Sequence, residues 1–195
     1  MKISLSLFLT TLLFFNVSAQ NFDINVLKDI QSTRTHKLDV AFENFSKSTY
    51  PVSAAIPLGM LGVGLITKDK NLQRQGIASG AALAISMGTT ILLKHVIDRH
   101  RPYEKYPFIQ PYVVETDPSF PSGHTTAAFS VATSLSLVAP KWYVIVPAYA
   151  WAGTVAYSRM HLGVHYPTDV LAGAVIGAGS AWATHRINRW LQKKR

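Results

Sequence analysis

The stretch GIASGAALAISMGTTILL, residues 76–93, contains no charged residue and has nearly the length of a membrane-spanning helix. At a rise of 1.5 Å per residue, about 20 apolar residues cross a hydrocarbon core of about 30 Å. Its glycine, alanine, serine and threonine residues are typical of helices that pack closely inside a membrane. This stretch therefore predicts a bundle of tightly packed helices, and the rest of the chain can be compared with it.

Four further stretches follow the same pattern, and only the last one carries a charged residue, Asp169, near its start. Together the five stretches predict an all-α fold, a helical bundle with five transmembrane helices. A soluble bundle with buried helices is the alternative, because the stretches are only moderately apolar. The four further stretches are residues 51–67, 121–139, 142–158 and 166–184.

The positions of the basic residues favour the membrane-spanning alternative. If the chain enters the first stretch from outside the cytoplasm, the basic residues at 68–74, Lys141 and those at 186–195 all fall on the cytoplasmic side. Membrane proteins follow this positive-inside pattern, whereas a soluble bundle has no reason to do so. The connections 94–120 and 159–165 then lie together on the outer side, which predicts a bacterial inner membrane protein with these segments facing the periplasm.

The first 19 residues are typical of an export signal. Lys2 precedes an apolar centre at 5–17, and the small-residue pattern Val17-Ser18-Ala19 predicts cleavage after Ala19. An uncleaved first anchor is the alternative, although the apolar centre is short for a membrane span. We therefore expect a signal peptide at residues 1–19 and a single domain at 20–195. Apolar residues at helical spacing between 22 and 50 predict amphipathic helices before the first span.

Composition excludes several classes of protein. A chain of 195 residues is enough for one compact domain, and the absence of cysteine excludes disulfides and thiolate metal sites. The net charge of +9 is spread over short runs between apolar stretches. A nucleic-acid partner would require one continuous basic patch, so none is expected. Membrane lipids are the expected surroundings, and the oligomeric state cannot be read from the sequence.

Two polar clusters frame the first outer connection. Lys94 and Arg101 lie seven residues apart, so on a continuing helix ended by Pro102 both cations would point the same way. The segment 99–120 is rich in proline and is predicted to be a loop. Asp98 and Arg99 are interpreted as a local ion pair. By itself, a basic residue at the end of a membrane helix usually only contacts lipid head groups.

The second cluster is Pro121-Ser122-Gly123-His124, at the start of an apolar helix. Ser122 can cap that helix, and Gly123 allows a ligand to approach the backbone. The free N–H groups and the positive dipole at a helix start suit a phosphate, beside which His124 would stand. The alternative interpretation is an ordinary cap next to an unrelated histidine.

The third cluster comprises Arg159, His165 and Asp169. The last two are four residues apart at the start of the last apolar stretch, with Pro167 tolerated in the first helical turn. This spacing places both side chains on one face of a helix, so the carboxylate can hold one imidazole nitrogen and leave the other free to attack. A carboxylate this close to a membrane span requires a partner or a function.

Taken together, the clusters supply what phosphoryl transfer requires. Three cations can neutralise the oxygens of a phosphate, and one histidine can attack phosphorus while another protonates the leaving oxygen. The sequence offers no carboxylate cluster suited to Mg²⁺ and no His/Cys set suited to zinc. We therefore expect a hydrolase of phosphate esters that uses no metal and no cofactor. The cations are Lys94, Arg101 and Arg159.

In order and internal spacing, the three clusters resemble the three motifs of the type 2 phosphatidic acid phosphatase (PAP2) superfamily. That superfamily includes membrane lipid phosphatases, soluble bacterial class A acid phosphatases and vanadium haloperoxidases. The resemblance implies that His165 is the nucleophile of a phosphohistidine intermediate, that Asp169 orients it and that His124 is the general acid. It also implies a set of phosphate-binding residues, namely Lys94, Arg101, Ser122, Gly123 and Arg159.

The expected function is that of a membrane phosphatase acting on a lipid phosphate or pyrophosphate at a periplasm-facing site. Candidate substrates are phosphatidic acid, phosphatidylglycerol phosphate, undecaprenyl pyrophosphate and lipid A phosphate. The main alternative is a soluble periplasmic class A-like acid phosphatase of broad specificity. Vanadate-dependent halide oxidation and a non-enzymatic lipid-binding or transport role are two further alternatives.

Overall fold

The computed structural model describes residues 22–193, and the regular secondary structure of this part of the chain is entirely helical. The expected all-α fold is therefore confirmed, while the expected signal peptide at 1–19 lies outside the described residues. A short helix at 22–32 precedes six helices. These are α2 (His36–Ile66), α3 (Lys70–Ile97), α4 (Pro102–Lys105), α5 (Gly123–Val138), α6 (Trp142–His161) and α7 (Pro167–Lys193).

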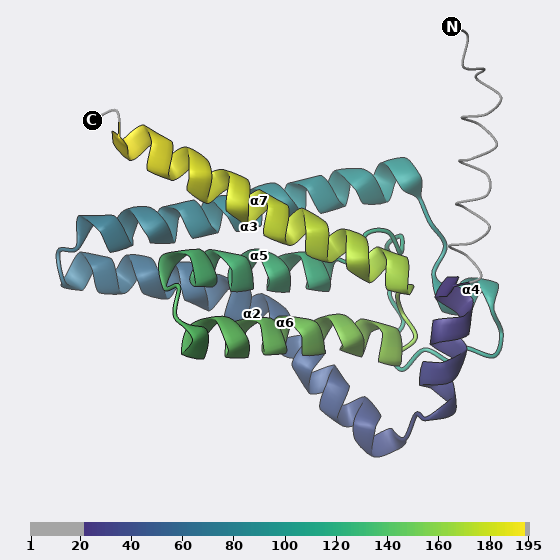
Figure 1. Ribbon diagram of the computed structural model, residues 1–195. Coiled ribbons are helices and arrows are strands. Elements are labelled where there is room, and N and C mark those ends of the chain that lie inside the picture. The colour runs from purple at the N-terminus through teal and green to yellow at the C-terminus, as the bar shows by residue number, and fades with distance from the viewer. Residues whose placement is uncertain (1–21, 194–195) are drawn as a thin grey trace, which may run out of the picture.

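The five long helices run side by side, and the chain reverses direction at the two ends of the bundle (Figure 1). The segments 98–122 and 162–166 lie at one end together with α4 and the helix at 22–32; we call this the loop end. The short connections 67–69 and 139–141 and the last part of α7 lie at the other end, which we call the basic end. The two connections expected on the outer side thus share one end of the molecule.

The first apolar helix begins earlier than its sequence pattern predicts. Thr35 caps α2 by accepting a hydrogen bond from the backbone N–H of Leu38, and the helix then continues through Pro51 and Pro57 to Ile66. A proline inside a helix removes one backbone hydrogen bond, whereas in the first turn its missing N–H would have had no partner. Here α2 packs against α3, α5 and α6, and this tertiary contact maintains the helix. α2 therefore contains the apolar stretch 51–67 up to Ile66 and extends before it to His36.

Two glycines bring α7 into close contact with α5. A Cβ atom at Gly173 would lie 2.6 Å from the carbonyl oxygen of Ser122, and one at Gly177 would lie 2.2 Å from that of Thr126. Only glycine permits such an approach between the backbones, as is typical of closely packed membrane helices. This contact fixes the start of α7, with Asp169, beside the start of α5.

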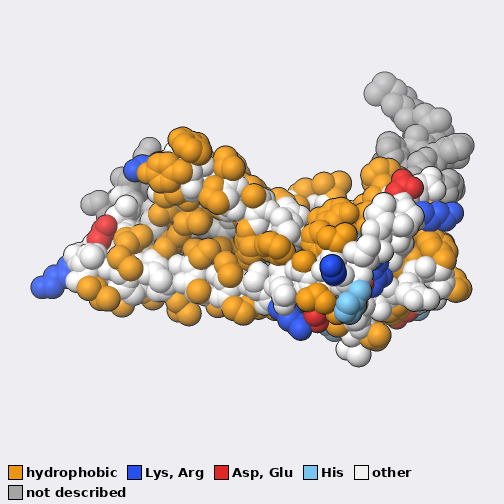
Figure 2. All heavy atoms as spheres, turned by 90° about the horizontal axis from the view of Figure 1, so that it is seen from below, with side chains coloured by type: hydrophobic (Ala, Val, Ile, Leu, Met, Phe, Trp, Pro, Cys, Tyr) orange, Lys and Arg blue, Asp and Glu red, His pale blue; other side chains and the backbone are white. Residues whose placement is uncertain are grey.

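The outer surface of the bundle is largely apolar between its two ends. Figure 2 shows hydrophobic side chains over the middle of the face in view, with charged side chains toward the ends. Two segments, His36–Ile66 and Lys70–Lys105, are long and apolar enough to cross a membrane by length and composition. The expected number of five spans therefore stays a prediction.

Candidate active site

A cavity of 90 Å³ lies at the loop end, and five of the eight candidate residues line it. The loop 98–122, the turn before α7 and the helices α2, α3 and α5 all contribute to its wall. The candidates on the wall are Lys94, Arg101, Gly123, His124 and His165. The remaining lining residues are Tyr50, Met87, Thr90, Ile91, Glu115 and Asp117.

Lys94 and Arg101 reach the cavity from different backbone environments, contrary to the expected continuous helix. α3 ends at Ile97, because Asp98 takes a left-handed conformation with φ of 45°. Arg101 then precedes α4, whose first residue is Pro102, so this proline starts a helix instead of ending one. A proline is favoured at this first helical position because its missing N–H would have no partner there.

His165 lies in the turn between α6 and α7, two residues before α7 begins at Pro167. The expectation that His165 and Asp169 share one helix is therefore wrong. The backbone N–H groups of Val164 and His165 both donate to the carbonyl oxygen of Arg159, at 3.1 and 3.2 Å. Gly163 adopts a φ of +76°, which allows this tight reversal.

The turn nevertheless places the His165 imidazole beside the Asp169 carboxylate. The Nδ1 atom of His165 lies 3.6 Å from Asp169 Oδ2, an ion-pair distance that exceeds a direct hydrogen bond. The Ser119 hydroxyl lies next to both groups, donating to Asp169 Oδ2 at 2.5 Å and standing 3.5 Å from His165 Nδ1. With Nδ1 facing these oxygens, Nε2 is the ring nitrogen near Arg101, at 3.4 Å from its Nη1.

The surroundings of His165 favour its neutral form. The side chain is 2% exposed, and this burial lowers the pKa of His165 to about 4, assisted by the charges of Arg101 and Arg159 and opposed by Asp169. Burial in a medium of low dielectric constant disfavours the charged imidazolium. A neutral imidazole has a free lone pair on one nitrogen, which is the form that can act as a nucleophile.

The second cluster forms the start of α5, and its serine is a helix cap. The Ser122 hydroxyl accepts hydrogen bonds from the backbone N–H and the hydroxyl of Thr125, while its own backbone N–H donates to the carbonyl of Asp169. The structure therefore does not place Ser122 on the cavity wall. Gly123 and His124 do line the cavity, in the first turn of α5, where backbone N–H groups lack acceptors within the helix.

Tyr50 from α2 packs against His124, and the sequence analysis did not identify it. The two ring centroids are 4.7 Å apart with the planes tilted by 51°. This contact fixes the orientation of His124 toward the cavity. Tyr50 is the residue before the first predicted span, and nothing in its local pattern indicated that α2 would extend to the site.

Each of the three candidate cations binds a carboxylate of the loop. Lys94 Nζ lies 3.0 Å from Asp117 Oδ2, and Arg101 Nη2 lies 2.6 Å from Asp117 Oδ1. Arg159, which is 2% exposed and is not among the lining residues, forms an ion pair with Glu115 and donates to Ser46 Oγ at 2.5 Å. Arg101 therefore shares Asp117 with Lys94 and Glu115 with Arg159, and the sequence analysis did not identify either carboxylate.

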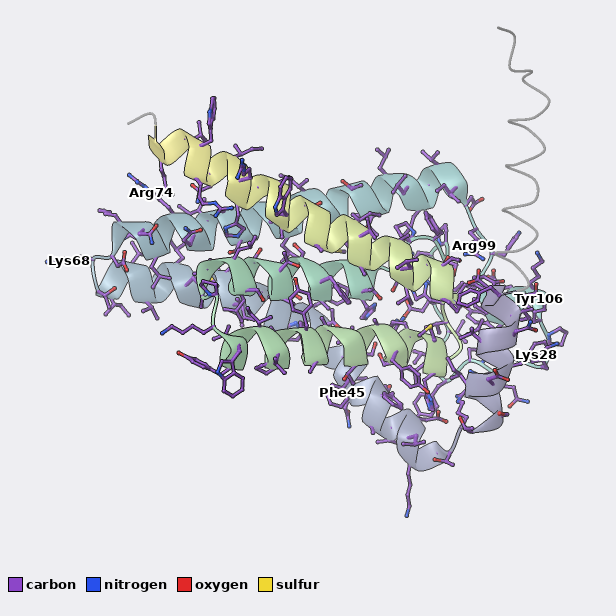
Figure 3. All side chains as sticks on the ribbon, viewed as in Figure 1. Lys28, Phe45, Lys68, Arg74, Arg99 and Tyr106 are labelled. Atoms are coloured by element: carbon purple, nitrogen blue, oxygen red, sulfur yellow. The ribbon has the colours of Figure 1, made fainter. Side chains whose placement is uncertain are left out.

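The partners of Arg99 also differ from the expected ion pair with Asp98, because Arg99 binds acidic residues distant in sequence. Its guanidinium pairs with Asp169 Oδ1 at 2.5 Å and with Asp23 Oδ2 at 2.8 Å, and stacks on the Tyr166 ring at 3.8 Å. Figure 3 shows Arg99 at the loop end, where Tyr106 also lies. Arg99 thereby links the helix at 22–32 to the carboxylate beside His165.

A larger cavity of 670 Å³ lies beside Arg99 at the loop end, and none of the eight candidate residues lines it. Its wall combines Asp23, Asp98, Arg99 and Tyr166 with residues around α4. Within residues 22–193, no group of three or more His, Asp or Glu side chains has the arrangement of a metal site.

Comparison with known proteins agrees with this geometry. The profile of the PAP2 superfamily matches residues 75–193, which include all three polar clusters. An undecaprenyl-diphosphatase of Sulfolobus acidocaldarius is 39% identical over 116 residues, 55% of this chain and 54% of that protein. A lipid A 4'-phosphatase of Bacteroides thetaiotaomicron is 36% identical over 77 residues, 37% of this chain and 34% of that protein. The matches thus span about half or less of these two relatives.

Two solved structures share the fold over most of the chain. LpxE of Aquifex aeolicus superposes with a TM-score of 0.73 at 25% identity, covering 85% of this chain and 95% of that one. The transmembrane PAP2-type phosphatidylglycerolphosphate phosphatase of Bacillus subtilis gives a TM-score of 0.76 at 23% identity and full coverage of both chains. Since the profile match extends over more than half of the sequence and contains every residue of the three clusters, the chain belongs to the PAP2 superfamily.

Proposed function

We propose that this chain is a metal-independent membrane phosphatase that hydrolyses a lipid phosphate or pyrophosphate through a phosphohistidine at His165, on the periplasmic side of a bacterial inner membrane. The observation that carries the proposal is the orientation of His165. Its Nδ1 faces Asp169 and Ser119, so its Nε2 is directed to the side where Arg101 lies. His124 lines the same cavity, and the resemblance to the PAP2 motifs implies that it is the general acid.

In the first step, Nε2 of neutral His165 attacks phosphorus and the bond from phosphorus to the leaving oxygen breaks. His124, which the negative charge of the bound substrate beside it holds in the protonated form, gives its proton to that oxygen. The imidazolium formed at His165 keeps its Nδ1 proton and is stabilised by Asp169. Lys94, Arg101 and Arg159 neutralise the charge on the phosphoryl oxygens, together with the N–H groups at the start of α5.

In the second step, water attacks the phosphorus of the phosphohistidine while His124 accepts a proton from it. The bond between Nε2 and phosphorus breaks, inorganic phosphate leaves and neutral His165 is restored. His124 thus acts first as acid and then as base. The proton that it gave to the leaving group is replaced by one from water, so both histidines end in their starting protonation states.

Support for a lipid substrate comes from the surface and from the relatives. An apolar crevice of 140 Å³ between α2, α5 and α6 is lined by Val52, Ile56 and Trp151 among others, and α2 also carries Tyr50 of the cavity wall. An acyl or prenyl chain in this crevice would therefore contact α2, the helix that also contributes to the cavity. Two relatives are named for undecaprenyl diphosphate and lipid A.

The test is a phosphate-release assay with the purified full chain in detergent, over a panel of the four candidate lipids. We expect turnover of at least one lipid, unchanged by EDTA, and recovery of the protein in the membrane fraction of cells. Loss of activity with EDTA and recovery with Mg²⁺ would contradict the metal-free mechanism. Release into the soluble fraction without detergent would contradict the membrane assignment and favour the soluble acid phosphatase.

The covalent step has its own test. Rapid quenching with a ³²P-labelled substrate should trap a phosphoprotein that is stable in alkali and labile in acid, as expected of phosphohistidine. The His165→Ala variant should show no such label. Equal labelling of wild type and variant would place the covalent step elsewhere.

A further inference from the structure

Two carboxylates occupy the contacts that a bound phosphate would need. Asp117 reaches both Lys94, at 3.0 Å, and Arg101, at 2.6 Å. Glu115 pairs with Arg159 and lies 3.7 Å from Arg101. All three cations of the proposed phosphate site therefore already have an anionic partner, and Arg101 is shared between the two carboxylates.

The segment that carries these carboxylates is held in place by its backbone. The Tyr103 hydroxyl donates to the carbonyl of Glu115 at 2.8 Å and accepts from its N–H at 3.3 Å. Arg101 Nε donates to the carbonyl of Asp117 at 2.9 Å, and Lys94 donates to the carbonyl of Pro118. Because the backbone is anchored on both sides, the two side chains can turn away from the cations without moving the loop.

Exposure differs strongly between the two sides of these ion pairs. The side chains of Arg101 and Arg159 are 1% and 2% exposed, whereas those of Glu115 and Asp117 are 25% and 50% exposed. A buried arginine cannot leave its position for water, but a partly exposed carboxylate can. Displacement by an incoming anion would therefore move the carboxylates and leave the cations in place.

Both carboxylates are ionised at neutral pH. Burial alone would raise the pKa of Glu115, but the charge and the hydrogen bond of Arg159 outweigh it and lower the pKa below its usual value. For Asp117, burial is likewise outweighed by Lys94 and Arg101, so its pKa is also lowered. Two negative charges thus compete with any anion that enters the site.

We propose that Glu115 and Asp117 are specificity-determining residues, which compete with phosphate for Lys94, Arg101 and Arg159 and so exclude phosphate compounds that lack an apolar anchor. A small soluble phosphate must displace both carboxylates with its own charge alone. A lipid phosphate gains additional binding energy from its chain and is concentrated at the membrane. The same competition promotes release of inorganic phosphate after hydrolysis. This proposal rests on the proposed function.

The experiment compares wild type with Glu115→Gln, Asp117→Asn and the double variant, which retain side-chain volume and a hydrogen-bond acceptor. The matched control is Asp98→Asn, which removes an exposed charge at the same end, at a residue that lines the larger cavity. The readouts are the inhibition constant of inorganic phosphate, kcat/KM for p-nitrophenyl phosphate and kcat/KM for dioleoyl phosphatidic acid.

We expect the double variant to bind inorganic phosphate at least about tenfold more tightly, because the two competing negative charges are removed. A tenfold change corresponds to about 1.4 kcal/mol of binding free energy. Its kcat/KM for p-nitrophenyl phosphate should rise by a similar factor, while that for the lipid should change much less. The control should behave as wild type. Unchanged or weaker phosphate binding in the double variant would overturn the proposal, as would an equal gain for both substrates.

A binding measurement separates this proposal from the proposed function. Calorimetric titration of inorganic phosphate into His165→Ala, with and without Glu115→Gln and Asp117→Asn, requires no turnover. If wild type hydrolyses no lipid of the panel, the proposed function fails, while tighter phosphate binding here would still demonstrate the competition. If the double variant does not fold, Asp117→Asn alone supplies the test, because its side chain is half exposed.

Discussion

The two ends of the bundle both carry basic residues, yet these residues lie in opposite environments. At the basic end, Lys68, Lys70, Arg74 and Lys141 are all exposed to solvent. At the loop end, Lys94, Arg101 and Arg159 are 7%, 1% and 2% exposed and are paired with carboxylates. Figure 3 shows two of the exposed cations, Lys68 and Arg74, at the end opposite to Arg99.

This difference shows how one residue type serves two purposes in the same chain. Exposed cations at the end of a helix contribute little to stability and suit a membrane surface. Buried cations are costly to desolvate, so they persist only where partners or a function compensate for that cost. Burial together with converging partners, and not charge alone, distinguishes the candidate site from the exposed basic residues of the basic end.

The largest expected effect comes from comparing one buried histidine at each end of the bundle. His165→Ala should reduce kcat on the order of a thousandfold or more, because the proposed nucleophile is removed. His185, which is 3% exposed and lies 3.0 Å from Gln75 Oε1, is the matched control at the basic end. His185→Ala should retain near wild-type kcat and lose about 1–3 kcal/mol of stability. A phosphate-release assay measures kcat, and thermal unfolding measures stability. Comparable losses of kcat in the two variants would contradict a catalytic role that belongs to His165 alone.

A second comparison exchanges an arginine at each end for lysine. Arg101 uses Nε, Nη1 and Nη2 to contact Asp117 and the carbonyl of Val164. A lysine offers one compact ammonium group, so Arg101→Lys should lower kcat/KM by about 10- to 100-fold. Arg74→Lys, an exposed exchange at the basic end, should leave kcat/KM unchanged. Steady-state kinetics measures kcat/KM for both variants. An unchanged kcat/KM in Arg101→Lys would argue against multidentate anion binding.

A smaller effect is expected at Arg99, which contacts Asp169 and does not line the 90 Å³ cavity. Arg99→Lys should lower kcat by about three- to tenfold, in the range of one weakened charge-assisted hydrogen bond. KM should stay constant, since the phosphate contacts are intact. Asp23→Asn should produce a similar but weaker change, because Asp23 holds the other side of Arg99. A rise in KM without a fall in kcat would place Arg99 in substrate binding.

The smallest effect concerns the protonation of His165. Because its folded-state pKa is lowered to about 4, the imidazole should stay neutral as pH falls through 6 and 5, and become charged only near pH 4. An unperturbed histidine would be protonated around pH 6.5. Histidine-selective ¹⁵N NMR of the ligand-free protein in micelles measures this titration, with His165→Asn assigning the signal. A midpoint near 6.5 would show that His165 is more hydrated than its burial indicates.

Much of the site could be predicted because it depends on helix order. Five apolar stretches must alternate in direction, so the residues at 94–101, 121–124 and 159–169 had to meet at one end. Their local details depended on the turns instead. The helix ends at Ile97 and not at Pro102 because Asp98 turns left-handed, and His165 precedes α7 because Gly163 reverses the chain.

Most of the residues that sequence analysis did not identify belong to a segment without periodicity, although Tyr50 lies on the long helix α2. Glu115, Asp117 and Ser119 lie in the loop 98–122, whose path is set by contacts such as those of Tyr103 and Arg101. Arg99 was paired with its neighbour because its true partners, Asp23 and Asp169, are 76 and 70 residues distant. Such contacts follow from the folded chain and leave no local pattern.

The turn between α6 and α7 sets the spacing between Arg159 and His165. Two consecutive backbone N–H groups donate to the carbonyl of Arg159, and a Cβ atom at Gly163 would lie 3.0 Å from Ile109 Cγ2. One inserted residue would shift the imidazole of His165 relative to the guanidinium of Arg159. The stretch 106–114 packs on the same turn, because Ile109 is buried against Gly163 and the backbone N–H of Tyr112 donates to the carbonyl of Leu162. Designers who graft new substrate loops onto this scaffold should therefore keep both this stretch and the interval of five residues after Arg159 constant.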